Sequence, residues 1–337
     1  MIEESLKTAK AGFYRFSVAP MMDWTDRHCR LFHRAFTRRA LLYTEMVTAD
    51  ALLHGPAERL LARDPGDGPV ALQLGGAVPE ALGRAASLAV DHDFDEINLN
   101  VGCPSDRVQS GCFGAALMLQ PDRVAECVRA MIAAAGPVPV TVKCRIGVDE
   151  QEPQVVLPRF LQTLAQAGIG RVAIHARKAW LRGLSPKENR TVPPLDHGLV
   201  AEMKAAFPRL AIVVNGGIED LAAARALLDR GLDGVMLGRA AYRTPALLGE
   251  VDRAIFGMPG SDVAPEAAVR AMLPHIERER ARGTPLHAIT RHMLGVFAGR
   301  PGARAWRRLL SEEAPRPGAG PEVVERALAL VRPPLAA

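Results

Sequence analysis

Eight short apolar runs, separated by helix-like segments, constrain the fold of this chain more than any other feature of its sequence. They are rich in β-branched residues and show little strict alternation, as expected for parallel strands covered on both faces. The runs read FSVAPM (16–21), LLYTEM (41–46), VALQLGG (70–76), EINLNVGCP (96–104), PVTVKCR (139–145), RVAIHAR (171–177), AIVVNGGI (211–218) and GVMLGRA (234–240). Apolar residues recur at helical spacing between them, as in 79–90, 121–135, 155–166 and 220–228.

This alternation predicts an α/β fold with a parallel sheet. Eight strand–helix units within about 240 residues match the number of units and the length of a closed (β/α)₈ TIM barrel. An open, doubly wound sheet is the structural alternative. It is disfavoured because the first strand is not followed by a GxGxxG turn.

The alternation of strand-like and helix-like segments ends after Pro245. The remaining chain predicts helices at 265–282, 285–298, 302–313 and 321–332. Short segments rich in Gly and Pro separate these helices, as at helix ends generally. We therefore predict a small all-α helical domain after the barrel, with domains at 1–250 and 251–337.

Composition excludes several classes of protein. Of the 337 residues, 48% are hydrophobic and 23% are charged, which is ordinary for a soluble globular protein. No stretch of 18 apolar residues predicts a membrane span, and the N-terminus does not resemble a signal peptide. Five cysteines without a CxxC pair predict neither a disulfide scaffold nor a cysteine-based zinc site. We expect a cytoplasmic protein with no bound metal.

The net charge of +5 is concentrated in the last quarter of the chain. Residues 265–337 hold 12 arginines, no lysine and seven acidic residues, whereas residues 1–264 are balanced. A basic segment of this kind indicates a polyanionic partner such as nucleic acid. The alternative is an arginine-rich helical face that is merely solvated.

Polar or reactive side chains stand near the end of almost every predicted strand. In a TIM barrel these ends form the catalytic face, so the set as a whole indicates an active site. Its members are Met21, Met22, Asp23, Glu45, Gln73, Asn98, Asn100, Cys103, Lys143, Arg145, His175, Arg177, Asn215, Gly216, Gly217, Gly238 and Arg239.

The last two strand ends predict a phosphate site, because barrels commonly bind phosphate with the loops after strands seven and eight. Gly216, Gly217 and Gly238 lack side chains, so backbone N–H groups can approach an anion. Arg239 would add a charge-assisted hydrogen bond. An Asn-Gly-Gly sequence alone is also an ordinary turn.

Lys143 has three interpretations: a Schiff-base lysine, a cation facing an electron-rich cofactor, or a solvated strand end. Lysines seldom occupy a central strand without a partner. His175 alone would more often be a structural histidine, but the presence of Lys143 among the same strand ends favours a functional role for it. Gln73 offers a donor and an acceptor that suit an amide-like ring edge, although it could equally cap the barrel mouth.

Cys103 leaves its strand through Gly102 and is followed by Pro104, so we expect it in a loop at the mouth. A thiol is mostly protonated at neutral pH and can act as a general acid or a nucleophile. Cys29, Cys127 and Cys144 are predicted to be packing residues, whereas Cys112 lies in the same loop as Cys103 and is less easily assigned.

The chain resembles the tRNA-dihydrouridine synthases, and in particular their A branch, which acts on uridines 20 and 20a of the tRNA D-loop. The resemblance runs from residue 19 to residue 242. Ala116 departs from the pattern, because several relatives have Cys there. The resembling segments are APMMDWTDRHCR, TEMVTADALL, ALQLGG, INLNVGCPSDRVQSGCFGAALM, VTVKCRIG, IHARKAWLRGLSPKENR, VNGGI and MLGRAAY.

The resemblance implies a role for each site residue. Pro20, Met21 and Met22 line the flavin; Gln73, Lys143 and His175 contact the FMN ring and ribityl chain; Asn215, Gly216, Gly217, Gly238 and Arg239 hold its phosphate. Asn100 touches the target uridine and Cys103 is the proton donor. Lys187, Arg190, Arg304 and Arg307 contact tRNA, which makes 1–250 the FMN-binding catalytic domain and 251–337 the tRNA-binding domain of a monomer.

The implied reaction is the reduction of uridine to 5,6-dihydrouridine. NADPH reduces FMN, hydride passes from N5 of FMN to C6 of uracil, and Cys103 protonates C5. The alternatives are a flavin-dependent dihydroorotate dehydrogenase, a Schiff-base aldolase using Lys143, and a non-catalytic RNA-binding barrel. The first of these has no use for the arginine-rich tail.

Overall fold

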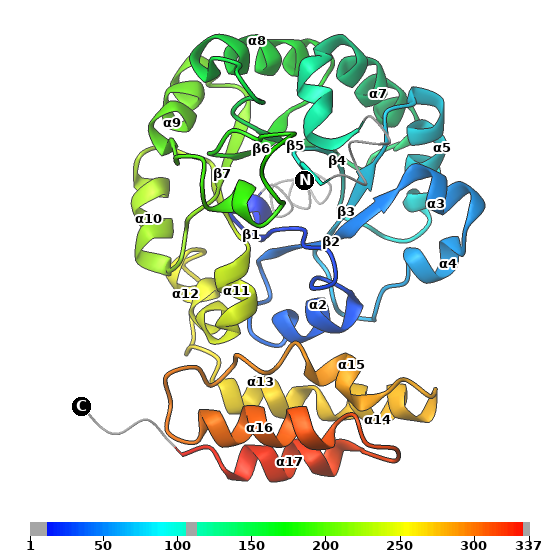
Figure 1. Ribbon diagram of the computed structural model, residues 1–337, viewed down its shortest axis with the longest axis vertical. Helices are drawn as coiled ribbons and strands as arrows, with labels where there is room; N and C mark the ends of the chain where they lie inside the picture. The colour runs from blue at the N-terminus through cyan, green and yellow to red at the C-terminus, as the bar shows by residue number, and fades with distance from the viewer. Residues whose placement is uncertain (1–11, 106–112, 333–337) are drawn as a thin grey trace.

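The computed structural model describes residues 12–105 and 113–332, and within them the chain forms a closed barrel of eight parallel strands. Each strand pairs with the next along the chain, and the first pairs with the last (Figure 1). This confirms the predicted TIM barrel. The strands are β1 (Phe16–Val18), β2 (Leu41–Thr48), β3 (Val70–Gly75), β4 (Glu96–Val101), β5 (Val140–Arg145), β6 (Arg171–His175), β7 (Ala211–Asn215) and β8 (Gly234–Leu237).

Helices surround the barrel, and many of them begin where the sequence provides a start signal. Asp26, Thr48, Asp196 and Asp220 accept hydrogen bonds from backbone N–H groups in the first turns of α2, α3, α9 and α10. Proline begins α5, α7 and α8, because its missing N–H costs nothing there. The barrel helices are α2 (Arg27–Arg34), α3 (Ala49–His54), α4 (Ala57–Leu60), α5 (Pro79–Val90), α7 (Pro121–Ala134), α8 (Pro153–Gln166), α9 (His197–Ala206), α10 (Leu221–Asp229) and α11 (Arg239–Arg243), with short 3₁₀ turns at η1 (Phe13–Arg15), η2 (Gly114–Leu119), η3 (Glu188–Arg190) and η4 (Pro245–Glu250).

The strand register divides the barrel interior into two kinds of packing. One apolar group fills most of its circumference, whereas polar side chains follow one another along β3, β4 and β5. Gln73 is opposite Asn98, and Asn98 is opposite Thr141. The apolar group consists of Ala19, Leu41, Tyr43, Ala71, Ala173, Val213 and Met236.

The C-terminal part is helical, as predicted, and packs below the barrel in Figure 1. Trp306 is fully buried there; its ring meets Phe297 edge to face at 5.0 Å, and its Nε1–H donates to the Met293 carbonyl. None of the helices within the described residues is long and apolar enough to cross a membrane. The helices are α12 (Val251–Ala254), α13 (Pro265–Ala271), α14 (Leu273–Ala281), α15 (Leu286–Thr290), α16 (Ala303–Glu313) and α17 (Pro321–Ala329).

Two of the predicted C-terminal helices differ from the observed ones. The segment 265–282 is two helices rather than one, because Pro274, the second residue of α14, cannot continue the hydrogen bonding of α13. The segment 285–298 is helical only as far as Thr290. Beyond it the chain forms turns, and a Cβ at Gly295 would lie 2.0 Å from the Arg243 carbonyl oxygen, so this segment lies directly on the end of the barrel.

Ion pairs join the helical part to the barrel. The Arg27 guanidinium of α2 pairs with Asp64 of the barrel and with Glu279 of α14. The carboxylate of Asp26 pairs with Arg291 at 2.6 Å, beyond the end of α15. These contacts hold α14 and α15 against the β1–α2 side of the barrel.

Residues just after position 250 contact the barrel itself. Asp252 in α12 accepts hydrogen bonds from the Thr37 hydroxyl at 2.5 Å and the Arg38 backbone at 2.7 Å. Arg15 donates to the Ile255 carbonyl at 3.2 Å. The domain boundary at 250/251 stays a prediction, and these contacts place α12 on the barrel side of the chain.

Candidate active site

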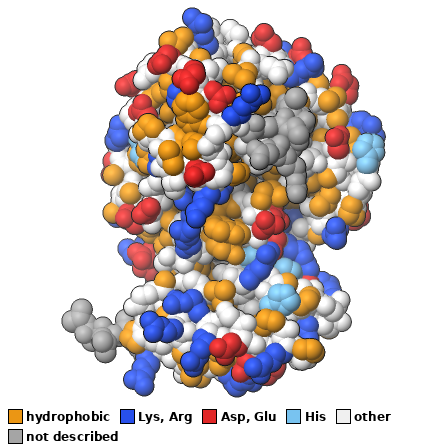
Figure 2. Space-filling model, in the orientation of Figure 1, with side chains coloured by type: hydrophobic (Ala, Val, Ile, Leu, Met, Phe, Trp, Pro, Cys, Tyr) orange, Lys and Arg blue, Asp and Glu red, His pale blue; other side chains and the backbone are white. Residues whose placement is uncertain are grey.

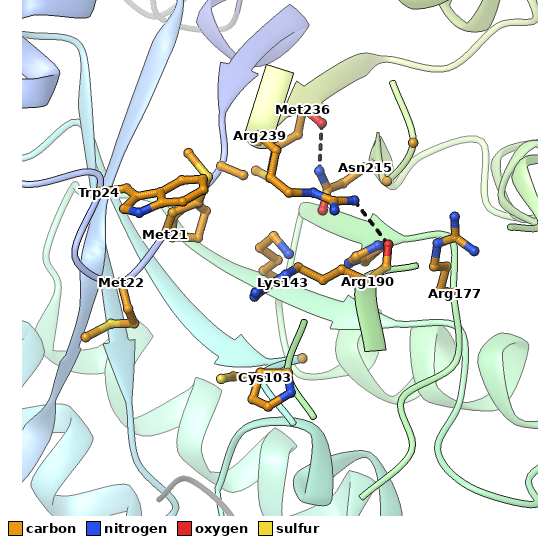
Figure 3. Close-up of a pocket in the computed structure, with 18 of the residues that line it drawn as sticks. Met21, Met22, Trp24, Cys103, Lys143, Arg177, Arg190, Asn215, Met236 and Arg239 are labelled. Carbon is orange, nitrogen blue, oxygen red and sulfur yellow. Dashed lines mark hydrogen bonds between the residues drawn. The ribbon is translucent and has the colours of Figure 1, made fainter. Parts of the chain in front are cut away.

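A cavity of about 850 Å³ opens at the carboxyl ends of the strands (Figure 3). Its volume falls within the range of roughly 300–1,000 Å³ of small-molecule and cofactor sites. Most of the residues predicted from strand ends and loops meet there. These are Pro20, Met21, Met22, Gln73, Asn100, Cys103, Lys143, His175, Arg190, Asn215, Gly216, Gly217, Gly238 and Arg239.

Five other predicted residues do not line this cavity: Glu45 and Asn98 of the strand-end set, and Lys187, Arg304 and Arg307. Lys187 is exposed beside Pro186, which does line it. Arg304 and Arg307 are exposed on α16, and Trp306 between them points into the core, as predicted. Figure 2 shows Lys and Arg side chains in blue over this helical part, mixed with acidic ones in red.

The lining of the cavity is strongly basic. Six lining residues are Lys or Arg, whereas Asp23 and Glu219 are the acidic members of the lining. Burial, followed by the nearby Arg145, lowers the pKa of Lys143 to about 8. Desolvation and the neighbouring Arg239 also lower the pKa of Arg190. Cations that repel one another in a cavity favour an anionic ligand.

Two arginines of the cavity lining donate to backbone carbonyls, and Figure 3 draws the hydrogen bond from Arg239. Arg239 donates to the Arg190 carbonyl at 3.1 Å, and Arg177 donates to the Pro193 carbonyl. The Nε of Arg177 is buried and has no hydrogen-bond partner among the residues that the structure describes. A buried N–H without a partner is costly, so this atom indicates a place for an acceptor.

Gly216 and Gly217 are required by the local backbone. Their φ angles are +106° and +67°, a region that favours glycine. A Cβ at Gly216 would lie 2.5 Å from the His175 ring, and one at Gly217 would lie 2.3 Å from Leu195. Gly238 is different, because a Cβ there would have only ordinary contacts at 3.6 Å. A Cβ would therefore fit at Gly238 without a clash, in contact with Ala19 and Met21.

Two further polar residues face this part of the cavity. Burial and the charges of Arg145 and Lys143 hold the pKa of His175 well below its usual value, so its imidazole is neutral. The Asn215 side-chain amide donates to the Met236 carbonyl at 2.7 Å, which leaves its oxygen as an acceptor.

Cys103 is half-buried and lines the cavity, as predicted for a loop at the mouth. Its backbone N–H donates to Asn100 Oδ1 at 2.9 Å, and its thiol lies 3.5 Å from the Ser105 hydroxyl. The thiol is thus held near the strand end by Asn100. Cys112 lies outside the described residues.

The other described cysteines are packing residues, as predicted. Cys29, Cys127 and Cys144 are fully buried in the core around the barrel. Burial raises the pKa of Cys127 to about 11 and that of Cys144 to about 12. Neither thiol is placed to exchange a proton with a ligand in the cavity.

The wall opposite the arginines is apolar, and it contains a residue that the sequence reasoning missed. Met21, Met22 and Trp24 lie on this wall (Figure 3). The Trp24 ring stacks on Tyr242, with centroids 4.3 Å apart. A single tryptophan within the β1–α2 loop was the only available signal, since its stacking partner is more than 200 residues away.

Comparisons with known proteins agree with this geometry. Residues 17–330 match the family model described as dihydrouridine synthase. A protein of Yersinia pestis named tRNA-dihydrouridine(20/20a) synthase is 57% identical over 320 residues, which are 95% of this chain and 92% of the relative. A protein of the same name from Escherichia coli strain K12 is 56% identical over 318 residues, 94% of this chain and 91% of the relative.

Solved structures of similar fold are more distant in sequence. The old yellow enzyme homologue of Zymomonas mobilis has a TM-score of 0.52 at 14% identity, covering 75% of this chain and 92% of that one. Morphinone reductase has a TM-score of 0.51 at 15% identity, covering 75% of this chain and 88% of that one. At these identities the likeness extends to the barrel fold alone.

Proposed function

The chain belongs to the dihydrouridine synthase family, and we propose that it reduces uridine to 5,6-dihydrouridine at positions 20 and 20a of the tRNA D-loop. The observation that carries this proposal is the 55–57% identity to proteins named tRNA-dihydrouridine(20/20a) synthase over at least 94% of this chain. Family membership decides against a dihydroorotate dehydrogenase and a Schiff-base aldolase.

Enzymes of this family are flavin-dependent oxidoreductases, and the cavity residues fit FMN. The unpartnered Nε of Arg177 and the excess of cations in the lining both suit a phosphate-bearing ligand. We assign the phosphate to Asn215, Gly216, Gly217, Gly238 and Arg239, and the ring and ribityl chain to Pro20, Met21, Met22, Gln73, Lys143 and His175. When bound, FMN would accept hydride from NADPH and supply it to uracil.

Cys103 has the chemistry and the position to complete the reduction. Hydride addition at C6 of uracil places negative charge at C5 and on the C4 carbonyl, so C5 must then gain a proton. The Cys103 thiol would hold that proton, and Asn100 would contact the uracil while it fixes the Cys103 backbone. Lys143 would stabilise negative charge that develops on the flavin.

Recognition of tRNA needs surfaces beyond the cavity. The target uridine must leave the base stack to reach a cavity at the barrel mouth. Lys187 and Arg190 at the rim, with Arg304 and Arg307 on α16, are proposed to contact the tRNA backbone. The enzyme would act as a monomer in the cytoplasm.

The test combines a spectrum with a product analysis. The purified protein should be yellow, and heating should release one equivalent of FMN. Unmodified tRNA incubated with the protein and NADPH should gain 2 Da at positions 20 and 20a, as read by mass spectrometry of nuclease fragments. The matched control is Cys103→Ala, which should stay yellow and oxidise NADPH. A colourless protein that cannot be loaded with FMN, or tRNA that gains no mass, would contradict the proposal.

A further inference from the structure

We propose that Glu96, at the end of the barrel interior farthest from the cavity, is a positioning residue for the reaction. It fixes the direction of a chain of hydrogen bonds that ends at the backbone of Cys103. The proposal rests on the proposed function, because Cys103 and Gln73 have their roles there. Glu96 is the first residue of β4, and Asn100 and Cys103 lie at the opposite end of that strand.

The chain begins at a buried carboxylate with three donors. The Glu96 side chain has no exposed surface, and it accepts hydrogen bonds from the Tyr43 hydroxyl at 2.6 Å, the Thr141 hydroxyl and the Arg171 guanidinium. Arg171 also balances its charge in an ion pair. A carboxylate accepts hydrogen bonds but does not donate them, so the Thr141 hydroxyl must donate its only hydrogen to Glu96.

Three buried amides continue the chain toward the cavity. The Asn98 amide donates to the Thr141 oxygen at 2.8 Å, and the Gln73 amide donates to Asn98 Oδ1 at 2.8 Å. Asn100 donates to Gln73 Oε1 at 2.8 Å. The Thr141 side chain and the three amides are at least 93% buried. Asn98 and Thr141 also lie away from the cavity lining, so water cannot replace a partner that either of them loses.

The chain ends on two backbone donors. Asn100 Oδ1 accepts from the N–H groups of Gly102 at 3.1 Å and Cys103 at 2.9 Å. Those groups can only donate, just as Glu96 can only accept. Every amide between the two ends must therefore present its nitrogen to the acceptor on the Glu96 side and its oxygen to the donor on the Cys103 side. This single consistent direction fixes how Gln73 and Asn100 present their polar atoms.

A polar chain of this kind is unusual for the interior of a TIM barrel, where bulky aliphatic side chains normally pack. Much of this interior follows that rule, with an apolar group that includes Leu41, Val213 and Met236. Thr141 and the three amides of the chain lie on β3, β4 and β5, the strands that carry Gln73, Asn100 and Lys143 at their cavity ends. Their location indicates a role at the cavity rather than in general packing.

The proposal is tested with two variants that disturb the direction of the chain. In Glu96→Gln the new amide has one acceptor atom for three donors. The Thr141 hydroxyl and the amides beyond it can then exchange their donor and acceptor roles. The reversal cannot be completed at Cys103, whose N–H only donates. Thr141→Val removes the link itself, and Thr141→Ser retains it and should restore wild-type behaviour.

Tyr43→Phe is the matched control. This variant removes one hydrogen bond from the same carboxylate. Tyr43 is not one of the links between Glu96 and Cys103, so the direction of the chain is preserved. The kcat for dihydrouridine formation should fall about tenfold in Glu96→Gln and Thr141→Val, the factor expected when one hydrogen bond is lost. The KM for tRNA should stay within about twofold. Tyr43→Phe and Thr141→Ser should keep the wild-type kcat even if their melting temperatures fall.

Hydrogen exchange provides a readout that does not depend on the reaction. The amides of Gly102 and Cys103 should exchange faster in Glu96→Gln and Thr141→Val than in wild type or Tyr43→Phe. Unchanged kcat and exchange in the first two variants would overturn the proposal and leave Glu96 a stabilising residue only. An equal loss in Tyr43→Phe would overturn it too. If wild type itself makes no dihydrouridine, the proposed function fails, and the exchange rates still decide whether Glu96 orients the chain.

Discussion

The barrel mouth and α16 both carry clusters of positive charge, but the two clusters are built differently. At the mouth, Lys143 and Arg145 converge on one cavity, and burial lowers their pKa values to about 8 and about 10. On α16, Arg304, Arg307 and Arg308 are exposed along one helix face. Burying a cation costs free energy of desolvation unless an anion binds beside it. Exposed cations instead attract a polyanion over a longer range, and salt screens that attraction. We expect the mouth to control individual chemical steps and α16 to modulate affinity.

The largest effect is expected from Cys103→Ala. Loss of a general acid should lower the rate of dihydrouridine formation by about 10²- to 10⁴-fold, measured as product per enzyme in single-turnover reactions. FMN content and NADPH oxidation without tRNA should be unchanged. The matched control is Cys127→Ala, a buried thiol on α7 that can lose stability but should keep the wild-type rate. A near-normal rate in Cys103→Ala would move the role to Cys112.

A smaller but clear effect is expected from Arg239→Ala. A hydrogen bond to a charged group contributes about 1.5–3 kcal/mol, so FMN should bind roughly 10- to 150-fold more weakly. The variant should lose flavin during dialysis, measured by absorbance at the flavin maximum. Arg225→Ala, on the exposed face of α10, should retain its flavin. Stoichiometric FMN in dialysed Arg239→Ala would place the phosphate elsewhere.

The pKa of Lys143 predicts a pH dependence of FMN binding. Without FMN the ammonium loses its proton near pH 8, and a bound anion would raise that pKa. FMN affinity should therefore be constant below pH 8 and should fall as pH rises through 8, by up to tenfold per pH unit until the raised pKa is reached. Quenching of flavin fluorescence between pH 6.5 and 9.5 measures this. In Lys143→Met the decline should disappear; if it persists, another group causes it.

The smallest effect is expected from neutralising Arg304 and Arg307 together. If both contact phosphates, tRNA binding should weaken severalfold at physiological salt, and the slope of log affinity against log salt should become shallower by about one per lost contact. NADPH oxidation without tRNA should not change. The slope is measured by filter binding from 50 to 200 mM salt, with Arg326→Gln on α17 as a control for helix stability. A wild-type slope in the double variant would leave these arginines without a role in docking.

The sequence predicted the barrel well because the pattern that indicates each strand lies within a few consecutive residues. Continuous apolar runs become strands wherever both faces are covered, and the observed strand ends differ from the predicted ones by a few residues. Helix ends in the C-terminal part were less accurate. Pro274 was readable as a break within 265–282, but the close approach of Gly295 to the Arg243 carbonyl depends on tertiary packing.

The candidate site was predictable for a similar reason, because parallel strands bring their carboxyl ends together whatever their distance in sequence. Pairs that depend on three-dimensional contact were not predictable. Trp24 stacks on Tyr242, and Arg27 reaches Glu279, across more than 200 residues without a shared motif. Glu96 was missed because it lies at the start of a strand, away from the end where chemistry is expected.

The contacts between the helical part and the β1–α2 loop have a consequence for how this chain could be recombined with its relatives. Asp26, which holds Arg291 and His292 of the helical part, is two residues from Trp24 on the cavity wall. Tyr242, on which Trp24 stacks, touches the same His292 through its hydroxyl. The helical part is thus not a detachable module. A chimaera that grafts another helical domain onto this barrel must also transplant the β1–α2 loop, or the cavity wall loses its support.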